Sequence, residues 1–376
     1  MQENCLFRFT AALAVVILAA PAGADVFHMP EGFVSLETVW IGNSGNGADA
    51  NGLGAVDYEY AIGKYEVTAG QYAEFLNAVA ATDTYGLYTP MMWVSGHPSG
   101  DFACKIERSG AAGAYTYDVA EDWVNRPVNF VSWADAARFA NWLHNGQPTG
   151  EQGLSTTEAG AYFLNGATTT AELMAVTREP DWLWAIPTID EWYKAAYHKN
   201  DGVTANYYSY PTGTNDESTL SNAVTDPDGG NNMNVFDGNW LSEDGWATGS
   251  PYYRTEVGQY ELSASPYGTF DQGGNVSEWN EAVGGNGGRS MSTANYHWVS
   301  AYLNSGRGLS NTSSADPSLF GASSPTWQDC GSGFRVVGRV VGTGVIPEPA
   351  SALVWLGLGM IGVAAIRRRT RDRRES

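Results

Sequence analysis

Residues 274–279 read Gly274-Asn275-Val276-Ser277-Glu278-Trp279, a turn followed by an acid and a large aromatic side chain. In the turn at Gly274 and Asn275, backbone carbonyls can point inward beside the Glu278 carboxylate, an arrangement that suits a hard cation. We expect Trp279 to bury its ring in the core, because burial of a large ring is the usual role of tryptophan. The same role is expected for Trp133, Trp142 and Trp192.

Three helices are predicted on the amino-terminal side of this segment. Each begins after a Ser or Thr whose side-chain oxygen can accept a hydrogen bond from the first turn. The predicted helices are 69–79 after Thr68, 133–143 after Ser132 with Asp135 in its first turn, and 189–197 after Thr188, where Glu191 completes a capping box. Residues 58–67 mostly alternate in character and predict a strand with an irregularity at Gly63.

The charge and composition exclude two classes of protein. The 376 residues include 20 Lys and Arg against 41 Asp and Glu, a formal charge of −21, which repels phosphates, so we expect no nucleic-acid partner. Hydrophobic residues make up 43% of the chain, which argues against intrinsic disorder. The 45 glycines and the Asn-, Asp- and Ser-rich stretch 207–246 predict long loops. No repeat or clean linker divides the body, so we expect a single domain.

Both ends of the chain have the character of targeting segments. Residues 1–24 carry Arg8, a short apolar run and a small-residue stretch, which predicts a secretory signal peptide; the alternative is a buried N-terminal helix. Residues 350–366 are uncharged and largely apolar, the low end of what a membrane-spanning helix needs. The arginines that follow from residue 367 predict a cytoplasmic tail, so the body faces outward.

The carboxyl-terminal region 345–376 is similar to a known sorting signal. Val345-Ile346-Pro347-Glu348-Pro349, the apolar helix and the Arg cluster, in that order, resemble the PEP-CTERM signal of bacteria that make extracellular polysaccharide. The resemblance implies processing by an exosortase near 347–349 and delivery to the cell surface or its matrix. The helix would then anchor the chain in the membrane only before processing. The alternative is a simple C-terminal anchor, which also places the body outside the cytoplasm.

The body, 25–344, resembles the formylglycine-generating enzyme family, also called the sulfatase-modifying factor domain. The resemblance covers roughly 39–341 and rests on the order and spacing of motifs that are individually weak. It implies an α+β fold, irregular and loop-rich, that forms a single domain related to C-type lectins. The motifs are Ile62-Gly63-Lys64-Tyr65-Glu66-Val67-Thr68, Pro127-Val128-Asn129-Phe130-Val131-Ser132-Trp133, Ile186-Pro187-Thr188, Glu191-Trp192, Tyr210-Pro211-Thr212-Gly213, Val257-Gly258, Pro266-Tyr267-Gly268, Gly274 to Trp279, and Gly333-Phe334-Arg335.

The resemblance also implies two structural calcium sites, because members of the family hold calcium in such loops. By motif position, the first would use the side chains of Asp271 and Glu278 with the carbonyls of Gly274 and Val276. The second would use Asn222, the carbonyl of Ala223, Asp244 and the carbonyl of Trp246. Ser277 and Ala223 depart from the usual residues at their positions, and the alternative is that Asp271 and Asp244 only shape turns.

The cysteines depart from the family pattern. Formylglycine-generating members oxidise a substrate cysteine with a pair of copper-binding cysteines, since soft thiolates select Cu(I). The corresponding stretch here, 289–307, contains no cysteine, and Asn295 and Ser300 stand near the expected positions, so copper is not expected. Cys5 leaves with the signal peptide, and Cys104 and Cys330 could form a disulfide in an oxidising compartment, although sequence cannot show that they meet.

The function expected from these features is a noncatalytic binding or structural module of the cell envelope or extracellular polysaccharide. Its partners would be matrix polysaccharide or a surface protein, bound through the aromatic and hydroxyl-rich stretch 291–324. The alternative is an oxidoreductase with an altered active site and an unknown substrate. Copper binding with oxygen consumption would favour that alternative.

Overall fold

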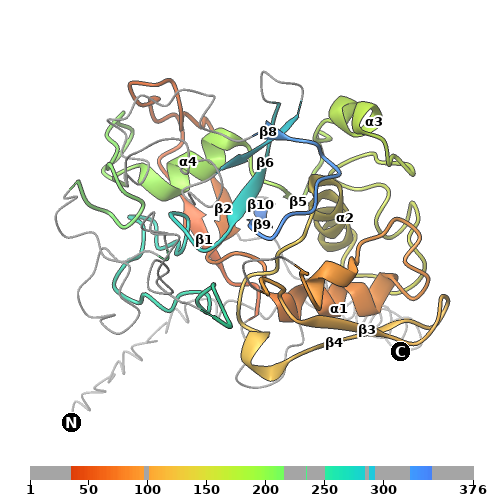
Figure 1. Cartoon of the computed structure of the whole chain (residues 1–376). Coiled ribbons are helices and arrows are strands. Elements are labelled where there is room, and N and C mark those ends of the chain that lie inside the picture. The colour runs from red at the N-terminus through yellow and green to blue at the C-terminus, as the bar shows by residue number, and fades with distance from the viewer. Residues whose placement is uncertain are drawn as a thin grey trace, which may run out of the picture.

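A computed structural model describes residues 35–96, 101–215, 234, 250–283, 288–292 and 322–340. Two four-stranded sheets, a two-stranded hairpin and four α-helices are linked by long loops in these residues, which confirms the α+β, loop-rich single domain (Figure 1). The signal-peptide region, the sorting tail, most of the predicted loop 207–246 and most of the predicted binding stretch 291–324 lie outside them. The relation to C-type lectins stays a prediction.

The described helices begin where the sequence predicts them, apart from one short helix that was not predicted. Thr68, Ser132 and Thr188 each accept a hydrogen bond from the third residue of their helix, and each forms a full capping box. The helices are α1 (Ala69–Val79), α2 (Trp133–His144), α3 (Thr170–Ala175) and α4 (Ile189–Tyr197), with short 3-10 helices η1 (Pro90–Met92) and η2 (Glu121–Trp123).

The first sheet joins the two ends of the described chain. Its order is β1-β2-β10-β5, and every pairing in it is antiparallel. The strands are β1 (Thr38–Ile41), β2 (Tyr60–Gly63), β5 (Trp184–Ala185) and β10 (Val337–Arg339). The predicted strand 58–67 is thus shorter than expected and ends at Gly63. The last described strand, β10, lies between two strands from the first half of the chain.

The second sheet carries the segment that contains Glu278. Its order is β8-β7-β6-β9, with β6 antiparallel to β7 and parallel to β9. The strands are β6 (Ser277–Val283), β7 (Arg289–Ser292), β8 (Ala322–Ser323) and β9 (Ser332–Gly333), while β3 (Ile106–Ser109) and β4 (Thr116–Val119) form a separate hairpin. In the view of Figure 1, α4 lies on one side of these strands and α1 and α2 on the other.

Aromatic packing between α1 and α2 forms the centre of the core. The Phe75 ring lies 5.3 Å from Phe139 and 5.2 Å from Trp142, measured between centroids, and Phe139 lies 5.1 Å from Phe334. All four tryptophans that the sequence assigns to the core are buried. Because Phe334 directly follows β9, this packing ties the two helices to the second sheet.

Candidate functional site

Strand β6 places Glu278 in a buried ion pair with Arg335. The Glu278 carboxylate accepts hydrogen bonds from Arg335 Nε at 2.5 Å and Nη2 at 2.7 Å, and a third from Trp192 Nε1 at 2.8 Å. Both partners are at most 1% exposed. Burial alone would lower the pKa of Arg335, but the Glu278 carboxylate raises it above its usual value. Arg335 therefore stays charged.

Arg335 also binds the backbone of segments far apart in sequence. Its guanidinium donates to the carbonyls of Gly63 at 3.0 Å, Lys64 at 3.3 Å and Phe270 at 2.9 Å. The side chain thereby joins the end of β2 to the loop before β6. Gly333-Phe334-Arg335 is one of the motifs that carry the family resemblance, but no role for its arginine was predicted.

Two further carboxyl groups lie near this ion pair. Glu66 is 1% exposed, and neither of its carboxyl oxygens has a hydrogen-bond partner among the described residues. Burial, and then repulsion from Asp271, raise the pKa of Glu66 well above its ordinary value. Burial likewise raises the pKa of Asp271 to about 6, although the Gly258 amide, at 2.7 Å, binds its Oδ2. The site has more carboxyl groups than arginines to neutralise them.

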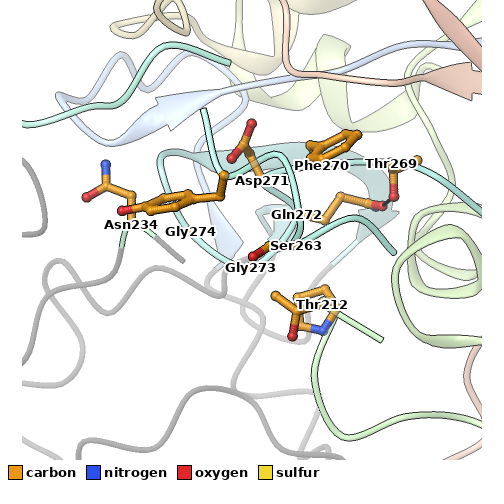
Figure 2. Close-up of a pocket in the computed structure, with 11 residues that line it drawn as sticks. Thr212, Asn234, Ser263, Thr269, Phe270, Asp271, Gln272, Gly273 and Gly274 are labelled. Atoms are coloured by element: carbon orange, nitrogen blue, oxygen red, sulfur yellow. Dashed lines mark hydrogen bonds between the residues drawn. The ribbon is translucent and has the colours of Figure 1, made fainter. Parts of the chain in front are cut away.

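Asp271 and Gly274 line one cavity, together with Thr212, Asn234, Thr269 and Gln272 (Figure 2). Asp271 has a φ of 62°, and its carbonyl accepts a hydrogen bond from the Gly274 amide at 3.2 Å. A side chain at position 274 would bring its Cβ within 2.6 Å of the Asn234 carbonyl oxygen. Glycine is therefore required where this turn passes Asn234.

Of the two predicted calcium sites, only the first lies among the described residues. Asp271 and Gly274 lie together at the cavity, and Val276 connects them to Glu278, whose carboxylate already binds Arg335 and Trp192. Oxygen donors and an orphaned buried carboxyl, Glu66, fit a hard cation in chemical type. Among the described residues no group of three His, Cys, Asp or Glu is arranged to hold a metal. Asn222, Ala223, Asp244 and Trp246 lie outside the described residues, so calcium stays a prediction.

A second charged cluster lies beside β6 and was not predicted. Arg178 binds Glu191 with Nη1 at 2.9 Å and Nη2 at 2.8 Å, and Glu281 with Nε at 2.6 Å. The hydroxyl of Tyr58 donates to Glu191 and that of Tyr162 to Glu281. Burial alone would raise the pKa of Glu191, but Arg178 lowers it below its usual value. Arg178 lies in a loop, and no periodic pattern in the sequence marks its role.

Strand β7 leads into the stretch where the family would carry its cysteine pair. Arg289 donates to the carbonyls of Leu173, Val176 and Glu281, and its guanidinium lies 4.0 Å from the centroid of Trp133. Ser292, the last residue of β7, accepts a hydrogen bond from Asn280 Nδ2 at 2.9 Å. The Arg289 side chain thus holds the start of β7 in place, and the strand ends at the Ser292 hydroxyl.

Comparison with protein families identifies two regions. Residues 30–340 match the sulfatase-modifying factor enzyme 1-like domain, which covers most of the chain. This chain belongs to the sulfatase-modifying factor family. Residues 345–369 match the PEP-CTERM protein-sorting motif, which marks the protein for export, exosortase processing and sorting to the cell surface. No helix in the described part of the chain is long and apolar enough to cross a membrane, and 350–366 lies outside that part.

Three solved structures of low sequence identity are similar to this member of the sulfatase-modifying factor family. CarF shares 18% identity at a TM-score of 0.43, with 81% of this chain and 99% of that chain covered. Treponema denticola variable protein 1 shares 19% at 0.45, with 83% and 98% covered. PvdO from Pseudomonas aeruginosa shares 15% at 0.39, with 81% and 95% covered. No curated protein matches the chain.

Proposed function

We propose that this surface-sorted protein is a noncatalytic module that binds neutral polysaccharide of the cell envelope or extracellular matrix. No cysteine occurs between Cys104 and Cys330, so the thiolate pair on which formylglycine chemistry depends has no counterpart in the corresponding stretch, 289–307. The Ser292 hydroxyl at the end of β7 is bound by Asn280. These features support a scaffold that has kept its fold without its redox groups.

An exposed tryptophan beside a row of hydroxyls carries the binding part of the proposal. Trp327, four residues beyond β8, is 51% exposed. Next to it in the chain, Thr326 Oγ1 lies 2.9 Å from Ser324 Oγ, which in turn lies 2.9 Å from Thr170 Oγ1 at the start of α3. We call Trp327, Thr326, Ser324 and Thr170 the Trp327 patch. An indole face that stacks on sugar C–H groups, flanked by hydroxyls that exchange hydrogen bonds, suits a saccharide.

The charge of the protein selects the kind of polysaccharide. At a formal charge of −21, the chain repels uronic-acid or sulfated polymers at low ionic strength. A neutral polymer pays no such cost, and stacking is insensitive to salt. We therefore expect retention on neutral polysaccharide that persists as the salt concentration rises.

Replacing Trp327 with alanine is expected to weaken retention on a neutral polysaccharide by about ten-fold or more, as for loss of a central aromatic contact. Affinity electrophoresis against neutral and acidic polysaccharides from the producing matrix measures the effect. Trp40→Ala is the matched control, because Trp40 is 42% exposed but lies on β1, away from the patch. Equal retention of W327A and wild type, or loss of retention in both variants, contradicts the assignment.

The noncatalytic part has its own test. Purified protein is titrated with Cu(I) and incubated with a cysteine-containing sulfatase peptide under oxygen. We expect neither stoichiometric tight copper binding nor conversion of the peptide thiol to an aldehyde. Oxygen consumption with aldehyde formation would instead establish the oxidoreductase alternative, whatever the polysaccharide result.

We further propose that calcium stabilises the turn before β6. The residues that would hold it are Asp271, Gly274, Val276 and Glu278, with a second site at Asn222, Ala223, Asp244 and Trp246. A bound divalent cation would neutralise the surplus carboxyl charge that Asp271 and Glu66 leave at the first site. Ionised Asp271 is the form that binds, so calcium should also hold that carboxyl deprotonated.

Exhaustive chelation is expected to lower the melting temperature by roughly 5 °C, as for a ligand present at about 100 times its dissociation constant. Calcium added back in excess should restore it, and magnesium should not, because magnesium gives up its water reluctantly. Asp271→Asn should remove most of the response, whereas Asp201→Asn, on an exposed loop, should keep it. An unchanged melting temperature after chelation would count against both sites.

For the tail, we propose that 350–366 holds the chain in the membrane until the exosortase cleaves near Pro347. The apolar run and the arginines behind it support this order of events. A chain with the tail arginines replaced by glutamine should lose its fixed orientation and its processing.

A further inference from the structure

Cys104 and Cys330 lie in one part of the fold although they are far apart in sequence. Cys104 is fully buried two residues before β3, and Cys330 is half-buried two residues before β9. Neither is in a disulfide in this structure. Each packs with the main hydrophobic core, Cys104 as a buried member and Cys330 at its edge.

Asn129 contacts the sulfur of Cys104 and the backbone of Cys330. Its backbone carbonyl lies 3.9 Å from Cys104 Sγ, and its side-chain amide donates to the Cys330 carbonyl. The same amide donates to the Phe102 carbonyl at 2.7 Å. One residue thus bridges the two cysteine-bearing segments, and the next amide, that of Phe130, binds the Asp329 carbonyl at 2.9 Å.

A buried arginine adds a positive charge beside the same pair. Arg254 is 3% exposed and donates to the carbonyls of Phe102 at 3.0 Å and Ala103 at 3.2 Å, directly before Cys104. In the described part of the chain no carboxylate lies within ion-pair distance of it, and its Nε has no hydrogen-bond partner. Its guanidinium interacts electrostatically with both thiols and with the Asp101 carboxylate.

The charge of Arg254 bears on the chemistry of the thiols. Burial raises the pKa of the Cys104 thiol, and the contact with the Asn129 backbone and the Arg254 cation oppose that rise only in part. A nearby positive charge favours the thiolate form, which is the nucleophile in thiol–disulfide exchange. The Arg254 cation thus acts on both thiols, and the Cys330 thiol also donates to Asp329 Oδ1 at 3.5 Å.

We propose that Cys104 and Cys330 form an intramolecular disulfide in the exported protein, with Arg254 as a positioning residue. The half-buried Cys330 thiolate attacks a small disulfide such as oxidised glutathione, forming a mixed disulfide and releasing one glutathione thiolate. The Cys104 thiolate then attacks the Cys330 sulfur and releases the second. Two thiol protons go to solvent, and two electrons go to the oxidant. The bond links the loop before β3 to the turn before β9.

The test uses the full chain with Cys5→Ser, exported to an oxidising compartment and purified without reductant. Digestion under non-reducing conditions should give one linked peptide that contains both cysteines and is lighter than its reduced parts by two hydrogen atoms. Free thiols at both positions, after export and after equilibration with oxidised glutathione, would overturn the proposal. So would a disulfide between two chains.

Melting temperatures distinguish a disulfide bridge from two reduced cysteines in the core. Reductant should lower the melting temperature of the Cys5→Ser chain by several degrees, because opening the bridge restores freedom to a long loop in the unfolded chain. Cys330→Ser should melt at the lower temperature and show no response to reductant, and Cys104→Ser should behave likewise. If reductant leaves the parent unchanged, or shifts the single variants equally, the bridge does not form.

The role of Arg254 has a separate readout. Closure of the reduced pair in a glutathione redox buffer should be slower in Arg254→Met than in the parent, and Arg254→Lys should restore part of the rate. Trp40→Ala, at an exposed position on β1, should close at the parental rate. A rate that is the same with methionine, lysine and arginine at position 254 excludes the positioning role.

Discussion

Replacing Arg335 with methionine is expected to lower the free energy of unfolding by about 3–5 kcal/mol, because it leaves the Glu278 carboxylate buried without its counter-charge. The guanidinium also binds three backbone carbonyls that would lose their donor. Urea unfolding followed by circular dichroism, in the presence of a chelator, measures the change.

Two variants control this prediction. In Glu278→Gln/Arg335→Met the charge is removed on both sides, so the loss should be clearly smaller than in the single variant. Arg339→Met removes an exposed arginine, the last residue of β10, and should change stability by no more than about 0.5 kcal/mol. A loss below about 1 kcal/mol for R335M would mean that another group neutralises Glu278.

Replacing Trp142 with alanine is expected to cost about 3–5 kcal/mol, the range for deleting a large buried aromatic side chain. Trp142 is 1% exposed, packs against Phe75 and Phe139, and donates from Nε1 to the Pro148 carbonyl at 2.9 Å. The cavity would lie between α1 and α2, where two rigid helices cannot collapse onto it.

The comparison variants for Trp142 are Trp142→Phe and Trp40→Ala. Phenylalanine should recover more than half of the loss, since it keeps most of the apolar contact but not the hydrogen bond. Trp40→Ala, at an exposed position, should cost less than about 1 kcal/mol. If W142A and W40A are destabilised equally, the α1–α2 packing is not the centre of the core.

The helices were predictable because their signals are local. Thr68, Ser132 and Thr188 each stand directly before an amphipathic run, and a cap needs only residues three positions apart. Each of the three predicted helices begins at the predicted residue, and α2 extends one residue further than predicted. The short helix α3 and the β3–β4 hairpin were missed because they are brief and partly exposed.

The candidate site was predictable only in part because its contacts are long-range. The motif pattern placed Asp271, Gly274 and Glu278 in one turn region, and the structure brings the first two to the same cavity. The partners Arg335 for Glu278 and Arg178 for Glu191 could not be derived, since each is a single arginine with no periodic pattern. Pairing of this kind depends on which distant loops meet, which tertiary packing decides.

The position of β10 has a consequence for how the protein matures during export. A strand that completes the middle of the first sheet is among the last parts of the domain to leave the ribosome and the translocation channel. The sheet can therefore close only after nearly the whole domain has crossed, when only residues 340–344 separate it from the sorting motif. Because the sorting motif begins at residue 345, processing there leaves β10 in the domain, so completion of folding and release by the exosortase become consecutive steps at the same short junction.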